Sequence, residues 1–350
     1  MRLAAFSLPL ARPLGTATGT IEAREGAVVE YDHRGETGVG EATPLPGWTE
    51  SLPECRAALD AAADAEASGG HSAALLELDA LAVPAARHGV STALLDADAR
   101  ADGLPLYRWF DGDRDCRSVP VNATVGDGPP TETARAVADA VAAGYDCVKV
   151  KVGNRPVAAD VDRLRAVRKR VDEAVTLRAD ANGAWASKEA EAAFEAFGDL
   201  GVSYVEQPLP ADDLAGHAAL REAAFDVGVA LDESLVGRRV DAVLDADAAD
   251  VLVLKPMALG GPGNAHTLAV RAREAGVEPV VTTTIDGVVA RLAALHVAAA
   301  VPDVTPCGLA TGDRLERDLG PDPTTVRDGE MTVPQAAGLG IDPAEVRPDA

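Results

Sequence analysis

The 350-residue chain lacks any hydrophobic run long enough to cross a membrane. A transmembrane helix needs about 20 consecutive apolar residues, and no run approaches that length although 47% of the chain is hydrophobic. Residues 1–13 carry an early arginine and a short apolar stretch, but no clear small-residue cleavage site follows. We therefore expect no secretory signal and a soluble, cytoplasmic protein.

Cysteine is scarce and scattered. Cys55, Cys116, Cys147 and Cys307 form no CxxC pair, whereas thiolate zinc sites and disulfide frameworks both need paired spacings. We expect buried free thiols. The six histidines fall outside every motif described below, so none is assigned a role.

Positive charge is also in short supply. The chain has 32 lysines and arginines against 56 acidic residues, for a net charge of -24. Such a field repels nucleic-acid phosphates and anionic membranes, so neither is an expected partner. An acidic surface with arginine in place of lysine resembles proteins of salt-loving cytoplasms, which predicts a halophilic habitat and says nothing of function.

Only five lysines occur, and three of them lie in apolar, strand-like runs. Lys149, Lys151 and Lys255 are these three, while Lys169 and Lys188 lie in polar helical stretches. Because a bare charge in an apolar run is costly, a retained lysine indicates a site that needs a compact ammonium group. The alternative is a structural salt bridge to a buried carboxylate.

From about Val119 onward, short β-rich runs alternate with Ala-rich amphipathic segments, as in βα units around a parallel sheet. The eight runs are 119–125, 147–152, 175–180, 202–206, 227–232, 251–255, 280–284 and 307–311. Eight such runs predict an α/β fold with a closed barrel over residues 116–319. A solenoid is the alternative, but the polar markers differ from unit to unit.

The chain before the barrel predicts a separate α+β capping domain over residues 1–115. Residues 28–31 and 37–41 favour a hairpin around Arg34 and Gly35, followed by Ala-rich helices. Two loops, 14–20 and 43–48, are rich enough in glycine, proline and threonine to cover a neighbouring site. Residues 320–350 are expected to pack back on this domain.

Three successive runs end in a carboxylate. From Lys151 to Asp180, Glu206, Asp232 and Lys255 the markers advance by 29, 26, 26 and 23 residues, about one βα unit each. Strand ends of a barrel converge on one site, and crowded carboxylates need a cation. An all-oxygen set suits Mg²⁺, with Mn²⁺ as a second candidate. The alternative is that each residue caps a helix.

Lys149 and Lys151 are two residues apart on one strand, so both side chains point to the same face. Alternation with valines places that face in the barrel interior, and Lys255 ends a strand farther round. Nearby cations favour the neutral form of a lysine, which makes it a competent base. A metal-bound substrate carboxylate would stabilise the enolate formed by such a base.

These residues fall in motifs that resemble those of the enolase superfamily, in its muconate-lactonizing subgroup, along nearly the whole chain. The motifs are Lys149-Val150-Lys151, Asp180-Ala181-Asn182-Gly183-Ala184-Trp185, Val205-Glu206-Gln207-Pro208, Asp232-Glu233-Ser234 and Leu254-Lys255-Pro256. The resemblance implies a capping domain and a (β/α)7β barrel with Mg²⁺ on the three carboxylates.

It further implies Lys151 as the base, with Lys149 also a catalytic lysine, and Lys255 as the opposite acid/base or as a stabilising cation. Glu233 would support the ligands, and Asn182 would hydrogen-bond near the metal and substrate.

Within the subgroup, the sequence leans toward the o-succinylbenzoate synthases. Residues 282–284 (Thr282, Thr283 and Thr284) offer hydroxyl and N–H groups for an anionic substituent, and Arg178 precedes the first carboxylate as in many such synthases. Dipeptide epimerases typically carry Asp-x-Asp at the eighth strand end, whereas residues 308–313 offer only Asp313.

The implied reaction is dehydration of 2-succinyl-6-hydroxy-2,4-cyclohexadiene-1-carboxylate to 2-succinylbenzoate, toward menaquinone, so the expected partner is a small-molecule carboxylate. An N-acylamino acid racemase or dipeptide epimerase is the second reading. A binding protein that has lost its chemistry is the third, although the intact lysines and carboxylates argue against it.

Overall fold

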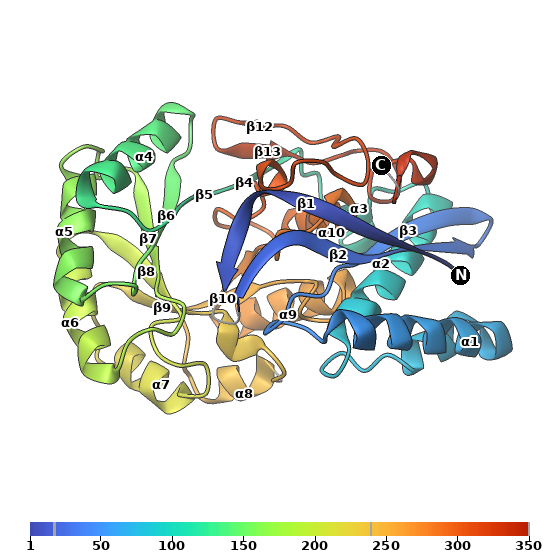
Figure 1. Ribbon diagram of the computed structural model, residues 1–350, viewed down its shortest axis with the longest axis horizontal. Helices are drawn as coiled ribbons and strands as arrows, with labels where there is room; N and C mark the ends of the chain where they lie inside the picture. Colours follow the sequence, from blue (N-terminus) through green and yellow to red (C-terminus); the bar gives the residue numbers. More distant parts are fainter. Residues whose placement is uncertain (17–18, 239, 349–350) are drawn as a thin grey trace.

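A curled sheet of seven parallel strands forms the larger part of the protein (Figure 1). The computed structural model describes residues 1–16, 19–238 and 240–348. In order along the chain the strands are β5 (Ala123–Val125), β6 (Cys147–Lys151), β7 (Thr176–Asp180), β8 (Val202–Glu206), β9 (Gly228–Leu231), β10 (Val251–Leu254) and β11 (Glu278–Val281). Each strand pairs with its neighbour in sequence, so the α/β barrel-type fold expected from the alternating runs is confirmed.

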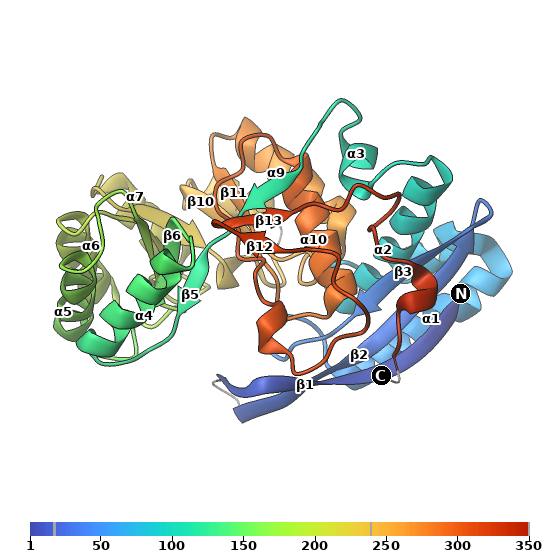
Figure 2. The same ribbon diagram turned by 90° about the horizontal axis from the view of Figure 1, so that it is seen from above.

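Helices follow the strands and cover the outer face of the sheet (Figures 1 and 2). They are α4 (Pro130–Ala142), α5 (Val157–Arg168), α6 (Ser187–Gly198), α7 (Leu214–Glu222), α8 (Val240–Asp245), α9 (Pro262–Glu274) and α10 (Val288–Ala300). Every residue of α10 is buried. A helix that is buried along its whole length must be covered on all sides, and α10 contacts both β11 of the barrel and β3 of the capping sheet.

The ends of the expected eight-stranded ring differ from the prediction. The first run divides into β4 (Ser118–Pro120) and β5, and β4 joins an antiparallel sheet with β12 (Val326–Arg327) and β13 (Glu330–Thr332). The eighth run makes only single bridges, Val121 to Cys307 and Thr282 to Gly308. Gly308 approaches so closely that a Cβ there would lie 2.4 Å from the Thr282 hydroxyl. The barrel is closed by this close contact, without a full ladder.

The capping layer is an antiparallel sheet of β1 (Arg2–Thr16), β2 (Gly19–His33) and β3 (Glu36–Ala42) packed on helices. Its helices are α1 (Leu52–Leu76), α2 (Pro84–Ala101) and α3 (Leu106–Phe110). Arg34 and Gly35 turn between β2 and β3 with φ of 54° and 86°, which confirms the predicted hairpin. Strand β3 lies directly on α2, because a Cβ on Gly40 would come within 1.9 Å of the Gly89 carbonyl.

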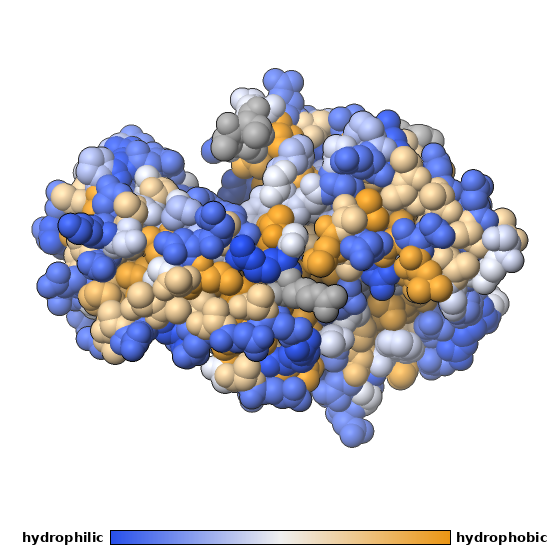
Figure 3. Space-filling model, turned by 90° about the horizontal axis from the view of Figure 1, so that it is seen from below, coloured by the Kyte–Doolittle hydropathy of each residue, from blue (hydrophilic) through white to orange (hydrophobic). Residues whose placement is uncertain are grey.

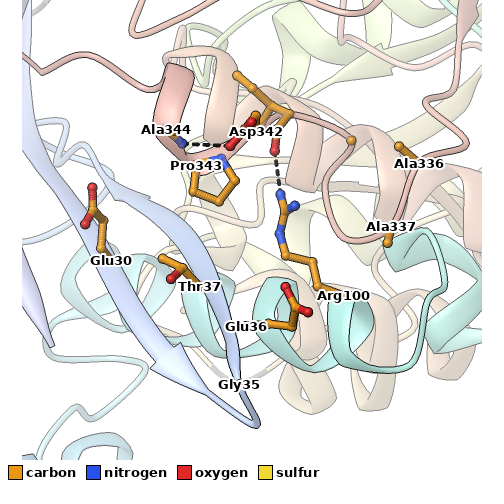
Figure 4. Close-up of a pocket in the computed structure, with 12 residues that line it drawn as sticks. Glu30, Gly35, Glu36, Thr37, Arg100, Ala336, Ala337, Asp342, Pro343 and Ala344 are labelled. Atoms are coloured by element: carbon orange, nitrogen blue, oxygen red, sulfur yellow. Dashed lines mark hydrogen bonds between the residues drawn. The ribbon is translucent and has the colours of Figure 1, made fainter.

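The last residues of the chain contact both parts of the protein. Strand β13 pairs with β4, while the Arg100 side chain of α2 donates to the Ile341 carbonyl. Figure 4 shows this arginine in a surface cavity lined by the cap hairpin and the turn η3 (Pro343–Glu345); none of the barrel's strand-end carboxylates or lysines lines it. The return of the tail to the cap agrees with these contacts. The domain boundaries at 115 and 319 stay predictions.

All four cysteines are free, and three of them, Cys55, Cys147 and Cys307, are buried, as expected. No helix within the described residues is long and apolar enough to span a membrane. The face seen in Figure 3 shows hydrophilic residues spread across it with apolar ones between them.

Candidate active site

Three carboxylates stand at adjacent strand ends, as the sequence predicts. Asp180 ends β7 and pairs in register with Glu206 at the end of β8, while Asp232 directly follows β9. Parallel pairing brings the ends of these strands to one edge of the sheet. All three side chains are buried, so their charges must be compensated.

Three lysines supply this compensation. Lys149 Nζ lies 2.8 Å from Glu206 Oε2 and 3.3 Å from Asp180 Oδ2. Lys151 Nζ lies 2.5 Å from Asp180 Oδ2, and Lys255 Nζ lies 2.5 Å from Asp232 Oδ2. The side chain of Lys151 is 34% exposed, against 14% for Lys149 and 11% for Lys255. Lys151 is thus the lysine most open to an incoming molecule.

The three carboxylates differ in the direction in which this buried, lysine-lined surrounding shifts their pKa. Burial raises the pKa of Glu206 to about 8, and repulsion from Asp180 adds to the rise while Lys149 opposes it. Burial also raises the pKa of Asp232 against the attraction of Lys255. For Asp180 burial acts in the same direction, but Lys149 and Lys151 outweigh it and hold the pKa below its usual value. Burial thus disfavours the charged form of Glu206 and Asp232 in spite of the neighbouring lysines.

The donor set fits a divalent cation. Within residues 1–16, 19–238 and 240–348 no three acidic, histidine or cysteine side chains are already gathered as metal ligands, since the carboxylates face the lysines. Asp232 Oδ1, however, is buried without a hydrogen-bond partner among the described residues. Carboxylate oxygens that repel one another, one of them unpartnered, are suitable ligands for Mg²⁺.

Asn182 connects Lys151 to a second acidic residue. Its Oδ1 accepts from Lys151 Nζ at 2.9 Å, and its Nδ2 donates to Glu233 Oε1 at 2.9 Å. Asn182 has a φ of 46°, a left-handed conformation that asparagine tolerates better than most residues. This chain of contacts orients the Lys151 ammonium and links it to Glu233, whose supporting role for the metal ligands stays a prediction.

Two family models match most of the chain. Residues 132–347 match the family described as enolase C-terminal domain-like. Residues 1–97 match the MenC N-terminal domain. The chain belongs to the enolase superfamily. It is therefore an enolase-superfamily enzyme, and the resemblance inferred from its motifs is confirmed at that level.

Relatives of this superfamily member have several activities. It is 33% identical to the L-Ala-D/L-Glu epimerase of Bacillus subtilis over 96% of this chain and 94% of the relative. It is 37% identical to the o-succinylbenzoate synthase of Thermobifida fusca over 65% and 72% of the two chains. It is 32% identical to the N-succinylamino acid racemase of Thermus thermophilus over 69% and 64%.

A solved structure extends the comparison. The dipeptide epimerase of Enterococcus faecalis, complexed with Mg and the dipeptide L-Leu-L-Tyr, superposes with a TM-score of 0.84 at 28% identity. The match covers 97% of this chain and 98% of the epimerase. Superfamily relatives thus include both lyases and isomerases, and the halophilic habitat stays a prediction.

In this enolase-superfamily enzyme, Gln207 holds Asp232 in place, a role that the sequence analysis missed. Its Oε1 accepts from the backbone N–H groups of Asp232 and Ser234 at 3.1 and 3.0 Å. Its Nε2 donates to Ser234 Oγ at 2.8 Å and to the Leu209 carbonyl at 3.0 Å. The side chain is fully buried with a φ of 45°. Its place in the Val205–Pro208 motif was the only signal.

Trp48 covers Lys255 from the capping layer. The Lys255 Nζ lies 3.3 Å from the centre of the Trp48 ring, a cation–π contact. The expectation that the 43–48 loop covers a neighbouring site is confirmed by this contact. The other expected loop, 14–20, is described only as the ends of β1 and β2, and its residues 17–18 lie outside the described chain.

Arg178 lies inside the barrel, one layer below the carboxylates. It is cross-strand partner to Lys149, and its guanidinium donates to the Pro306 carbonyl at 2.5 Å. The same group lies 4.8 Å from the centre of the Tyr204 ring. These are contacts with the protein interior, and a substrate-binding role for Arg178 stays a prediction.

The threonine cluster at the β11 end is engaged with protein atoms. The Thr282 hydroxyl donates to the Gly308 carbonyl at 2.9 Å, and that of Thr284 donates to Asp286. The Thr283 hydroxyl shares a hydrogen bond of 2.9 Å with Thr311. Thr283 is thus the member whose proton is not committed to a carbonyl or carboxylate. Anion binding by the cluster stays a prediction.

Proposed function

We propose that the enzyme abstracts a proton next to a substrate carboxylate, with Asp180, Glu206 and Asp232 as Mg²⁺ ligands. One observation carries this proposal: two lysines contact the buried carboxylates from different strands, Lys151 through Asp180 and Lys255 through Asp232. Mg²⁺ bound there would neutralise charge that develops on the substrate carboxylate. Lys151, the most exposed of the lysines, is the base.

We propose o-succinylbenzoate synthase as the specific activity. Lys151 takes the proton from the ring carbon that bears the carboxylate. It then returns this proton to the hydroxyl on the adjacent carbon, which leaves as water as the C–O bond breaks. The new double bond completes an aromatic ring. Lys255, which contacts Asp232 and Trp48, takes no part in the proton transfer of this reaction.

The end of the eighth run supports the synthase over a dipeptide epimerase. A dipeptide substrate carries an α-ammonium group that needs a carboxylate partner. Asp313, the only acidic residue in 308–313, is exposed, and its charge adds to the effect of burial in raising the pKa of Tyr145.

Turnover of the cyclohexadiene substrate tests the proposal. Purified protein with Mg²⁺ is expected to convert 2-succinyl-6-hydroxy-2,4-cyclohexadiene-1-carboxylate to 2-succinylbenzoate. The loss of the substrate's diene absorbance measures this conversion. Lys151→Ala should abolish turnover yet still bind Mg²⁺. Lys188→Ala is the matched control, because Lys188 is exposed on α6 and should leave the rate unchanged. Equal rates in both variants would reject Lys151 as the base.

An N-succinylamino acid racemase is the second candidate, favoured by the placement of Lys151 and Lys255 on different carboxylates. Two lysines on opposite faces of one carbon would exchange its proton in either direction. The measurement is deuterium incorporation from D₂O into N-succinyl amino acids and into L-Ala-L-Glu. Exchange of either compound without diene dehydration would replace the synthase assignment.

A further inference from the structure

Arg24 on β2 is a buried arginine with no part in the site described above. Its side chain is 1% exposed, although a guanidinium group is costly to bury. It donates to three main-chain carbonyls: those of Thr43 at 2.9 Å, Pro44 at 3.0 Å and Ile285 at 3.1 Å. Among the described residues, its one acidic contact within ion-pair distance is Asp286 Oδ1, at 3.7 Å. The three carbonyls thus satisfy most of its donors.

These carbonyls belong to two segments that border the site. Thr43 and Pro44 begin the loop that ends in Trp48, whose ring covers Lys255. Ile285 follows the threonines at the end of β11, 261 residues from Arg24 in the sequence. One side chain therefore joins the cap loop above Lys255 to the barrel loop beside it.

The backbone at Ile285 needs such support. Ile285 has a φ of 63°, a left-handed conformation that is rare for a β-branched residue. The neighbouring Asp286 side chain accepts from both the backbone N–H and the hydroxyl of Thr284. Strained backbone persists only where surrounding contacts hold it, and Arg24 supplies a contact from a different layer of the fold.

A second cap residue reaches the same barrel segment. Glu41 on β3 accepts from the Gly287 N–H at 2.7 Å and from the Ala290 N–H at 3.0 Å, at the N-terminus of α10. It also accepts from the Thr43 hydroxyl at 2.5 Å. Glu41 and Arg24 therefore join the cap to the β11–α10 loop at two neighbouring points. Of these two residues, Arg24 is the one that links the β11–α10 loop to the cap loop that carries Trp48.

We propose that Arg24 is a positioning residue that fixes the distance between the Trp48 loop and the β11 end, and so sets the room for the substrate substituent above Lys255. The hydrogen bonds and the ion pair found for Arg24 among the described residues involve none of the three site lysines and none of the three carboxylates. The effect of Arg24 is therefore expected in substrate affinity more than in the chemical step. The kinetic part of the test rests on the proposed function, whereas the structural part does not.

The test compares Arg24→Lys with Arg168→Lys. The Arg168 guanidinium also donates hydrogen bonds to main-chain carbonyls, including those of Leu200, Val175 and Gly201. These carbonyls precede β7 and β8, at the opposite end of the barrel. Both substitutions keep the charge and lose comparable hydrogen bonds. Only Arg24→Lys should act on the site.

Arg24→Lys is expected to raise KM about tenfold, equivalent to about 1.4 kcal/mol, with a smaller change in kcat. In hydrogen–deuterium exchange, the amides of Trp48 and Thr49, which both donate to the Leu45 carbonyl, should exchange faster. Arg168→Lys should leave KM and these amides at wild-type values. Wild-type KM and wild-type exchange in a folded Arg24→Lys protein would overturn the proposal.

The two measurements, of KM and of hydrogen–deuterium exchange, also distinguish a failure of this proposal from a failure of the proposed function. If the wild type does not turn over the cyclohexadiene substrate, the exchange comparison still decides whether Arg24 holds the loop. If Arg24→Lys does not fold, the wild type is measured alone. Its Trp48 and Thr49 amides should then be as protected as those of β3, and free exchange there would overturn the proposal.

Discussion

Replacing Gln207 with alanine should both destabilise the protein and weaken its hold on a metal. The Gln207 side chain makes five hydrogen bonds: to the N–H groups of Asp232 and Ser234, to Ser234 Oγ, to the Leu209 carbonyl and, at 3.4 Å, to His217 Nε2. All of these bonds are in the buried interior between β8 and β9. Alanine at this position leaves each partner without its bond.

The magnitude follows from this count. Each buried polar group left without a partner costs about 1–3 kcal/mol, but the Ser234 hydroxyl retains its bond to the Ala211 carbonyl. Three main-chain groups therefore lose their only side-chain partner, and water entering the space offsets part of the cost. We expect the free energy of unfolding to fall by about 3–5 kcal/mol. Because Asp232 is released, Mg²⁺ affinity should fall at least tenfold.

Urea unfolding and Mg²⁺ titration calorimetry measure the two effects. Gln335→Ala is the matched control. The Gln335 side chain donates to the Cys116 and Val333 carbonyls and accepts from the Tyr107 hydroxyl, but it is exposed, so water can replace its partners. That variant should lose less than about 1.5 kcal/mol. Equal losses in the two variants, or unchanged Mg²⁺ affinity in Gln207→Ala, would refute the reasoning.

Three further outcomes are expected. Burial lowers the pKa of His296 from 6.5 to about 4; about 3 kcal/mol of stability is therefore present above pH 6.5 and lost as the pH falls toward 4. His296→Gln should flatten this acid limb in pH-dependent urea unfolding, while the exposed His71→Gln should not. A hundredfold excess of Mg²⁺ over its Kd should raise the free energy of unfolding of the wild type by about 2.7 kcal/mol; Asp232→Asn should lose that gain, and an equal gain in both proteins would argue against the ligand. Trp48→Leu removes the aromatic face over Lys255 and should lower kcat/KM about tenfold; an unchanged value would show that the contact does not support catalysis.

The strand-end residues could be predicted because a parallel barrel converts sequence spacing into position. A βα unit returns the chain to the same edge of the sheet, so Asp180, Glu206 and Asp232 needed only their place after apolar runs. Side chains alternate between the two faces of a strand, so the two-residue spacing of Lys149 and Lys151 predicted that they share a face. Local patterns of this kind carry the α/β fold, the hairpin at Arg34 and the candidate metal ligands.

Other features depended on contacts that no local pattern records. The eighth run reads as a strand, yet it makes only single bridges, because ladder pairing also depends on its neighbours. Arg178 and the threonines had the right spacing for substrate binding, but interior partners engage them in the folded protein. Spacing in the sequence predicts at which edge of the sheet a residue lies, but it does not predict which atoms become its hydrogen-bond partners.

By itself, the sequence determined the barrel-type fold and the residues at the strand ends, because hydrophobic period and βα spacing are local properties of the chain. The superfamily followed from the resemblance of short motifs, which are also local. Only the tertiary structure decided what surrounds the strand-end residues. Trp48 reaches Lys255 and Arg24 reaches Ile285 across more than 200 residues of chain. Such contacts exist only because the capping sheet packs against α10, and that packing is set by the complementary shapes of two surfaces.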